Sequence, residues 1–84
     1  MWAMGEVVRV ILYSRVGCHL CDEARTAILA ERRSVPFGFD EVLIDGNEDL
    51  ERRFGLRVPV VTVNGREEFE LSVQAARFRR LVSG

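Results

Sequence analysis

The sequence predicts an α/β fold in which a four-stranded mixed sheet carries helices on both faces. Three observations support this prediction. Residues 7–13 form a nearly continuous apolar run rich in β-branched side chains, which is typical of a central strand. Apolar residues at helical spacing fill the segments between the expected strands. Asn64-Gly65, between two short strand-like segments, is the strongest local signal for a hairpin.

The chain length sets the expected domain organisation. With 84 residues there is room for one domain, over residues 1–84, in which residues 1–6 would form a flexible terminus. Hydrophobic residues make up 48% of the chain and charged residues 30%, which is the composition of an ordinary globular protein rather than a disordered one.

The first half of the chain predicts a parallel strand-helix-strand unit. After the strand at residues 7–13, a helix is expected to run to about residue 33, where Val35-Pro36 would prevent its continuation. Its apolar face would be formed by Leu20, Ala24, Ala27 and Ile28. The second strand is expected within residues 37–45, and the right-handed crossover makes it parallel to the first.

The second half predicts a short helix, a hairpin and a closing helix. Gly46-Asn47 is turn and cap chemistry, and residues 48–54 carry acids in the first turn and arginines in the last, with Gly55 as a stop. Strands are expected at residues 60–63 and about 67–70, on either side of Asn64-Gly65. The closing helix would present an apolar face of Leu71, Ala75, Phe78 and Val82.

Charge and hydropathy exclude several classes of partner. Lysine and arginine number 12 against 13 acidic residues, a formal charge of -1, so neither nucleic acid nor a membrane surface is an expected partner. The longest apolar run is far shorter than a membrane span, and the start lacks the features of a secretory signal. We therefore expect a cytoplasmic monomer.

Cys18 and Cys21 are the residues that carry chemistry. Three positions apart, they form either a redox pair or half of a metal site. Cys18 falls between the first strand and the first helix, where free backbone N–H groups and the helix dipole stabilise a thiolate. Cys21 lies one turn further on and is expected to be more buried. The spacing therefore predicts that Cys18 attacks a disulfide and Cys21 resolves the mixed disulfide.

Three further positions are candidates for a role at this site. His19, at the helix start, would act as a cation near Cys18, or would be an exposed residue with no role. Arg15 would hold the thiolate or a substrate carboxylate, or would be a solvated loop residue. Val58-Pro59 begins a strand, where a cis peptide bond is one way to make the turn.

The segment 13–21, Tyr-Ser-Arg-Val-Gly-Cys-His-Leu-Cys, resembles the active-site segment of glutaredoxins. Residues 41–45 and 58–65 also fall where that family has its second strand and its cis-proline strand. The similarity spans about residues 7–82, and Gly-Cys-His-Leu-Cys is the motif of a group of small bacterial glutaredoxin-like proteins.

This resemblance implies a thioredoxin fold with strand order 2-1-3-4 and a cis-proline loop packed against the cysteines. It implies that the backbone of Val58 pairs with an extended substrate beside Pro59. Arg15 takes the place of a lysine that binds a glutathione carboxylate, and Arg57 adds a second positive group. The substrate would be a disulfide-containing protein or a low-molecular-weight thiol, with glutathione or a reductase as electron donor and no tightly bound cofactor.

Two features depart from the family pattern. Residues 68–72 replace the usual Gly-Gly turn and acid that grip glutathione. The first strand has no buried acid of the thioredoxin kind, since its only polar side chain is Arg9.

Other functions remain alternatives to an oxidoreductase. A mononuclear zinc site is disfavoured because only His19 would add a conventional nitrogen ligand to the two cysteines, and no metal site is expected. A dimer could hold an iron–sulfur cluster between its cysteines. The chain could also be a non-catalytic thioredoxin-fold adaptor.

Overall fold

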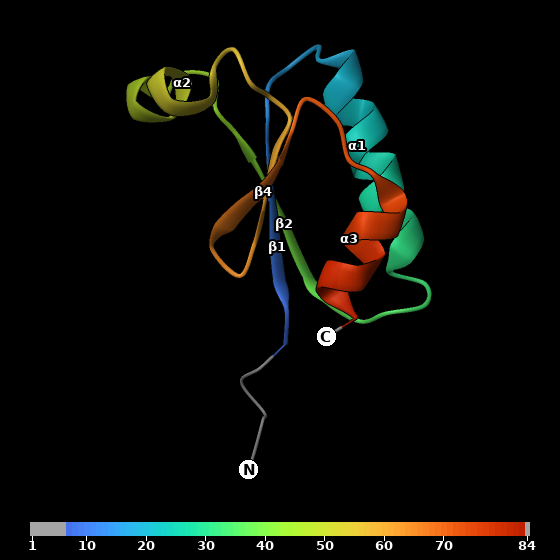
Figure 1. The fold of residues 1–84 in the computed structure, drawn as a ribbon. Coiled ribbons are helices and arrows are strands. Elements are labelled where there is room, and N and C mark those ends of the chain that lie inside the picture. The colour runs from blue at the N-terminus through green and yellow to red at the C-terminus, as the bar shows by residue number, and fades with distance from the viewer. Residues whose placement is uncertain (1–6, 84) are drawn as a thin grey trace.

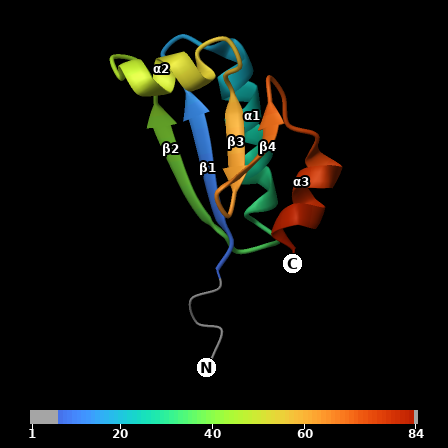
Figure 2. The same ribbon diagram turned by 60° about the vertical axis from the view of Figure 1, so that its left-hand side comes forward.

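The computed structural model of the protein describes residues 7–83; the terminus predicted at residues 1–6 lies outside that range. Seven elements follow in the predicted order: β1 (Arg9–Ser14), α1 (His19–Glu31), β2 (Gly38–Leu43), α2 (Glu48–Phe54), β3 (Val60–Val63), β4 (Arg66–Glu70) and α3 (Ala75–Val82). The strands form one sheet in the order β2-β1-β3-β4, with β1 and β2 parallel and the other pairs antiparallel. The predicted fold class and strand order are confirmed (Figures 1 and 2).

The helices divide between the two faces of the sheet. Helices α1 and α3 cover one face, and α2 lies on the other side, over the end where β1 and β2 finish (Figure 1). The main core lies beneath α1 and α3 and comprises Val10, Leu12, Ala24, Ile28, Phe37, Val61, Val63, Phe69, Phe78 and Val82. A second cluster at the end of the sheet contains Cys21, Ile44, Phe54, Val58 and Val60. The cysteine motif is therefore anchored in this smaller cluster.

Local turn chemistry positions the elements as predicted. Asn64 and Gly65 have φ angles of 52° and 84°, as a tight hairpin turn requires. The Asn47 side chain caps α2 by accepting a hydrogen bond from the Leu50 N–H at 3.0 Å. Gly55 follows α2, but its φ of -49° is right-handed, so the end of this helix does not depend on a left-handed glycine.

The predicted apolar faces of α1 and α3 each contain an error. Leu20 is 46% exposed instead of buried. Leu71 is equally exposed and lies outside α3, with a φ of 71°. Its N–H donates to the carbonyl of Pro59 at 2.8 Å, which holds this segment against the β3 entry, so the helix begins only at Ala75, itself exposed.

None of the helices within residues 7–83 is long and apolar enough to cross a membrane.

Candidate active site

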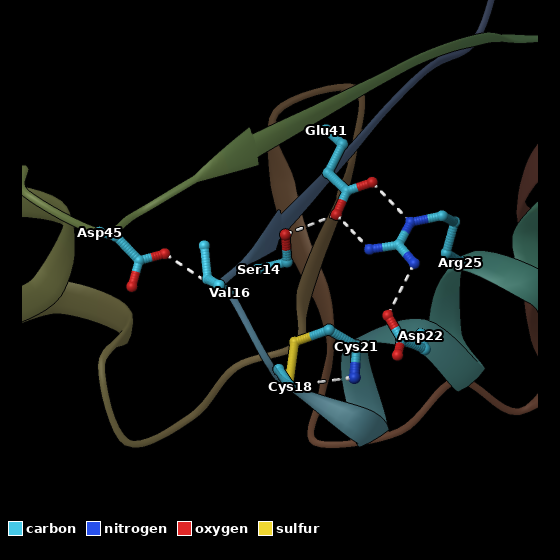
Figure 3. Close-up of a disulfide and its surroundings, with 8 residues drawn as sticks. All are labelled: Ser14, Val16, Cys18, Cys21, Asp22, Arg25, Glu41 and Asp45. Carbon is cyan, nitrogen blue, oxygen red and sulfur yellow. Dashed lines mark hydrogen bonds and ion pairs between the residues drawn. A yellow bond between two sulfur atoms is a disulfide. The ribbon is translucent and has the colours of Figure 1, made fainter.

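Cys18 and Cys21 are joined by a disulfide at the N-terminus of α1 (Figure 3). Cys18 is the N-cap residue, and its Sγ accepts a hydrogen bond from the Cys21 backbone N–H at 3.1 Å. Cys18 is half-buried, whereas Cys21 has no exposed surface. The expectation that Cys21 is the more buried cysteine is confirmed. The sulfur of Cys18 lies where the helix end stabilises negative charge.

Two features shape the loop between β1 and α1 that carries Cys18. Gly17 has a φ of 74°, a conformation that favours glycine, and it turns the chain from β1 into α1. The Val16 N–H donates to the Asp45 carboxylate at 2.9 Å (Figure 3). This contact fixes the loop to the segment after β2.

A polar network lies beside the disulfide and was not predicted from the sequence. The Ser14 hydroxyl donates to Oε2 of Glu41 at 2.6 Å. Arg25 donates to both oxygens of the same carboxylate, from Nε at 2.7 Å and from Nη2 at 2.6 Å. These bonds, those from Arg25 first, hold the pKa of Glu41 below its usual value, although burial acts in the opposite direction. Glu41 therefore carries a fixed negative charge near the motif.

The sheet register explains why Glu41 is in this position. Leu12 pairs with Glu41, so both side chains project from the face that α1 covers. The prediction that β1 ends at residue 13 with Arg9 as its only polar side chain was wrong, because Ser14 belongs to the strand and is fully buried. The period of two through Phe39 and Glu41 was the sequence signal for an acid facing the helix.

His19 is not directed at the cysteines. Its side chain is 84% exposed, and its Nε2 lies 3.0 Å from the Glu23 carboxylate one turn along α1. Within residues 7–83, the only hydrogen bond to the Cys18 sulfur comes from Cys21. The geometry therefore favours the alternative of an exposed cap residue.

The two candidate arginines differ in their surroundings. Arg57 donates from Nη1 to Glu67 at 3.0 Å and to Glu70 at 2.9 Å, and these carboxylates raise its pKa. Its charge is thus already matched by two acids. Arg15 is half-buried, and its Nε is buried without a hydrogen-bond partner among the described residues. Arg15 is the better placed of the two to receive an anionic group.

Val58 and Pro59 adjoin the cysteine pair. Both residues are buried and their peptide bond is cis. Val58 shares the second apolar cluster with Cys21, and Cys18 packs against that cluster. Within the described part of the chain, neither the N–H nor the carbonyl of Val58 has a hydrogen-bond partner. The structure thus places Val58 beside the cysteines with a free N–H and carbonyl, whereas the guanidinium of Arg57 is bound to Glu67 and Glu70.

Residues 7–83 contain no group of three or more His, Cys, Asp and Glu side chains arranged to hold a metal ion.

Sequence comparisons identify relatives of the chain. The protein Rv0508 of Mycobacterium tuberculosis, described as uncharacterized, is 37% identical over 78 residues, which cover 84% of this chain and 78% of that protein. The X-ray structure of target protein XcR50 from X. campestris is 41% identical, with a TM-score of 0.71 over 84% of this chain and 91% of the other. The solution structure of protein Ne2328 from Nitrosomonas europaea is 28% identical, with a TM-score of 0.81, and covers 99% and 100% of the two chains.

The fold and the family follow from further matches. A mutant thioredoxin from Halobacterium salinarum, 16% identical, aligns with a TM-score of 0.65 over 89% of this chain and 71% of the other, which shows the thioredoxin fold. The family described as Glutaredoxin-like domain (DUF836) matches residues 9–83. The chain therefore belongs to this glutaredoxin-like family, and it has a thioredoxin fold.

Proposed function

We propose that the protein is a dithiol–disulfide oxidoreductase whose nucleophile is Cys18. The observation that carries this proposal is the position of the Cys18 sulfur, which caps α1 and accepts the N–H of Cys21 while its partner sulfur is buried. A thiol in such a position ionises below its ordinary pKa of about 8.5 and becomes a nucleophile at neutral pH. A buried second thiol is available only to its neighbour.

The proposed reaction has two exchange steps. The Cys18 thiolate attacks one sulfur of a substrate disulfide, forms a mixed disulfide and releases the other substrate sulfur as a thiolate. Cys21 then loses its proton and attacks the Cys18 sulfur, which releases the second substrate thiolate and closes the disulfide seen in the structure. Two electrons pass to the substrate. A dithiol donor, or two molecules of a thiol such as glutathione, restores the reduced pair by the reverse exchanges.

The substrate is proposed to bind along Val58. Its free N–H and carbonyl can pair with an extended segment on either side of the substrate cysteine, as in other cases of strand addition. Arg15 would receive a substrate carboxylate through its guanidinium, which forms no ion pair among residues 7–83 and whose Nε is buried without a partner. Both features suit a protein disulfide or a glutathione mixed disulfide.

The rate of alkylation of the reduced protein as a function of pH tests the nucleophile. Iodoacetamide should modify Cys18 with a midpoint at least one pH unit below 8.5, and Cys21 much more slowly. If neither cysteine reacts with a depressed midpoint, the oxidoreductase proposal fails.

Single replacements test the two roles. Cys18→Ser should abolish reduction of a small disulfide, whereas Cys21→Ser should accumulate a mixed disulfide that mass spectrometry detects. Equal activity of the two variants would contradict the assignment. Assays of the unaltered protein with glutathione, and separately with a thioredoxin reductase system, would then identify the donor.

A further inference from the structure

Cys21, the resolving thiol of the proposed reaction, lies between an apolar cluster and a group of charged side chains. Cys21 is fully buried, and its apolar neighbours come from α2, β3 and the segment after β2. Tyr13 packs against the same cluster but stacks on Phe54 at 4.5 Å. Figure 3 draws four charged side chains around the disulfide: Asp22 and Arg25 of α1, Glu41 of β2, and Asp45 after β2, which accepts the Val16 N–H.

Ser14 lies at the C-terminal end of β1, and Cys21 lies in the first turn of α1, at the same end of the sheet. Alternate residues of β1, namely Val10, Leu12 and Ser14, are buried beneath α1. Ser14 is the last of them, at the end where α1 begins, and Cys21 is the first residue that α1 buries. Figure 3 shows the Ser14–Glu41–Arg25 contacts beside the disulfide. The network thus lies at the sheet end of the motif.

The charges in this network do not balance. Arg25 follows Cys21 by one helical turn, and it binds the Glu41 carboxylate and also Asp22, from Nη1 to Oδ1 at 2.9 Å. One guanidinium thus faces two carboxylates. Asp22 directly follows Cys21 in the chain and is largely exposed, whereas Glu41 is only 22% exposed. Charge on Glu41 is less screened by water than charge on Asp22.

We propose that the Ser14–Arg25–Glu41 network sets the acidity of the Cys21 thiol, with Glu41 opposing its ionisation and Arg25 favouring it. The inference rests on the proposed function, because only a resolving cysteine has to stay protonated until the mixed disulfide has formed. Glu41 and Arg25 are positioning residues in this scheme. In the resting reduced protein, the charge on Glu41 would keep Cys21 protonated, so that Cys18 is the thiolate.

A Cys18→Ser background gives a direct test, because Cys21 is then the only thiol and its thiolate absorbs near 240 nm. Adding Glu41→Gln should increase its acid dissociation constant roughly three- to tenfold, the effect of removing one partly buried charge at close range. Adding Arg25→Gln should decrease it by a similar factor. If these residues had only a structural role, the two substitutions would not change the acid dissociation constant of Cys21 in opposite directions.

Two further variants keep the test decisive. Asp40→Asn removes a charge from the same strand, but Asp40 is exposed and pairs with Arg9, so the Cys21 titration should change less than twofold. If Glu41→Gln does not fold, Asp22→Asn replaces it, since this exposed residue should shift the titration in the same direction by a smaller factor.

The inference would be overturned if Arg25→Gln and the acidic variant shifted the Cys21 titration in the same direction. It would also be overturned if one of them left the titration unchanged. That result would leave the alkylation behaviour of Cys18, and with it the proposed function, untouched.

Discussion

The carboxylate of Glu31, at the end of α1, accepts hydrogen bonds from Arg79 of α3, from Nε at 2.9 Å and from Nη2 at 3.0 Å. The two residues are 48 positions apart, and they join the helices that cover one face of the sheet. The bonds from Arg79 hold the pKa of Glu31 below its usual value of 4.5. The pair thus couples the docking of α3 to the ionisation of one carboxylate.

Acid should weaken this helix pair. Because the pKa of Glu31 is lower in the folded than in the unfolded chain, its contribution to stability is complete above about pH 5 and is lost as the pH falls through the folded value. Glu31→Gln should lower the free energy of unfolding at pH 7 and make its decline toward pH 3 shallower. Urea unfolding at several pH values measures both effects.

Asp49→Asn is the matched control for Glu31→Gln. Asp49 is 88% exposed, and among residues 7–83 it pairs only with Arg52 of its own helix. Its loss should leave the pH dependence of stability close to that of the unaltered protein. A Glu31→Gln profile parallel to that of the unaltered protein would contradict the role of the pair.

Leu71→Gly should stabilise the protein. Leu71 has a φ of 71°, a conformation that costs a residue with a side chain about 1 kcal/mol or more and costs glycine little. Its side chain is about half exposed, so little packing would be lost. We expect the free energy of unfolding to rise by about 1 kcal/mol, less the larger chain entropy of glycine in the unfolded state.

Leu71→Ala separates backbone strain from side-chain effects. Alanine keeps the Cβ that disfavours positive φ, so this variant should show no stabilisation. If Leu71→Ala stabilised the protein as much as Leu71→Gly, strain at this position would not be the cause.

Leu71 also shows where sequence reasoning reached its limit. The spacing Leu71, Ala75, Phe78 is helical, yet the conformation of Leu71 is set by its bond to Pro59, twelve residues away in the chain. The hairpin turn and the Asn47 cap were predictable because their causes lie within four residues. Local chemistry identifies local structure, and helical periodicity alone cannot say where a helix starts.

The same distinction applies to the candidate site. The placement of Cys18 and Cys21 follows from the strand-to-helix junction, which the apolar pattern reveals. Glu41 was missed because its partner on α1 becomes apparent only when the register of β1 against β2 is known. The partners of Arg57 were missed for a similar reason, because Glu67 and Glu70 come from β4 and only the fold brings them to the segment after α2.

Removal of the α2 cap should destabilise the end of the sheet that holds the motif. Asn47 accepts the Leu50 N–H, and α2 contributes the buried Phe54 to the cluster around Cys21. Asn47→Ala should cost about 1 kcal/mol of unfolding free energy, whereas Asn47→Ser, which keeps a capping oxygen, should cost less than half of that. Chemical denaturation distinguishes the two. Equal losses would show that the cap does not stabilise α2.

Arg15 should determine the preference for substrates that carry a carboxylate. Its guanidinium forms no ion pair within residues 7–83, and a charge-assisted bond from it to a substrate is worth about 1.5–3 kcal/mol. Arg15→Gln should therefore reduce the ratio of kcat/KM for oxidised glutathione to kcat/KM for neutral hydroxyethyl disulfide by about tenfold or more. The ratio is the decisive quantity because it does not depend on the fraction of active protein. Arg66→Gln removes an exposed arginine of the hairpin and should leave the ratio unchanged. Parallel losses on both substrates in Arg15→Gln would instead assign Arg15 to the structure of the loop before Cys18.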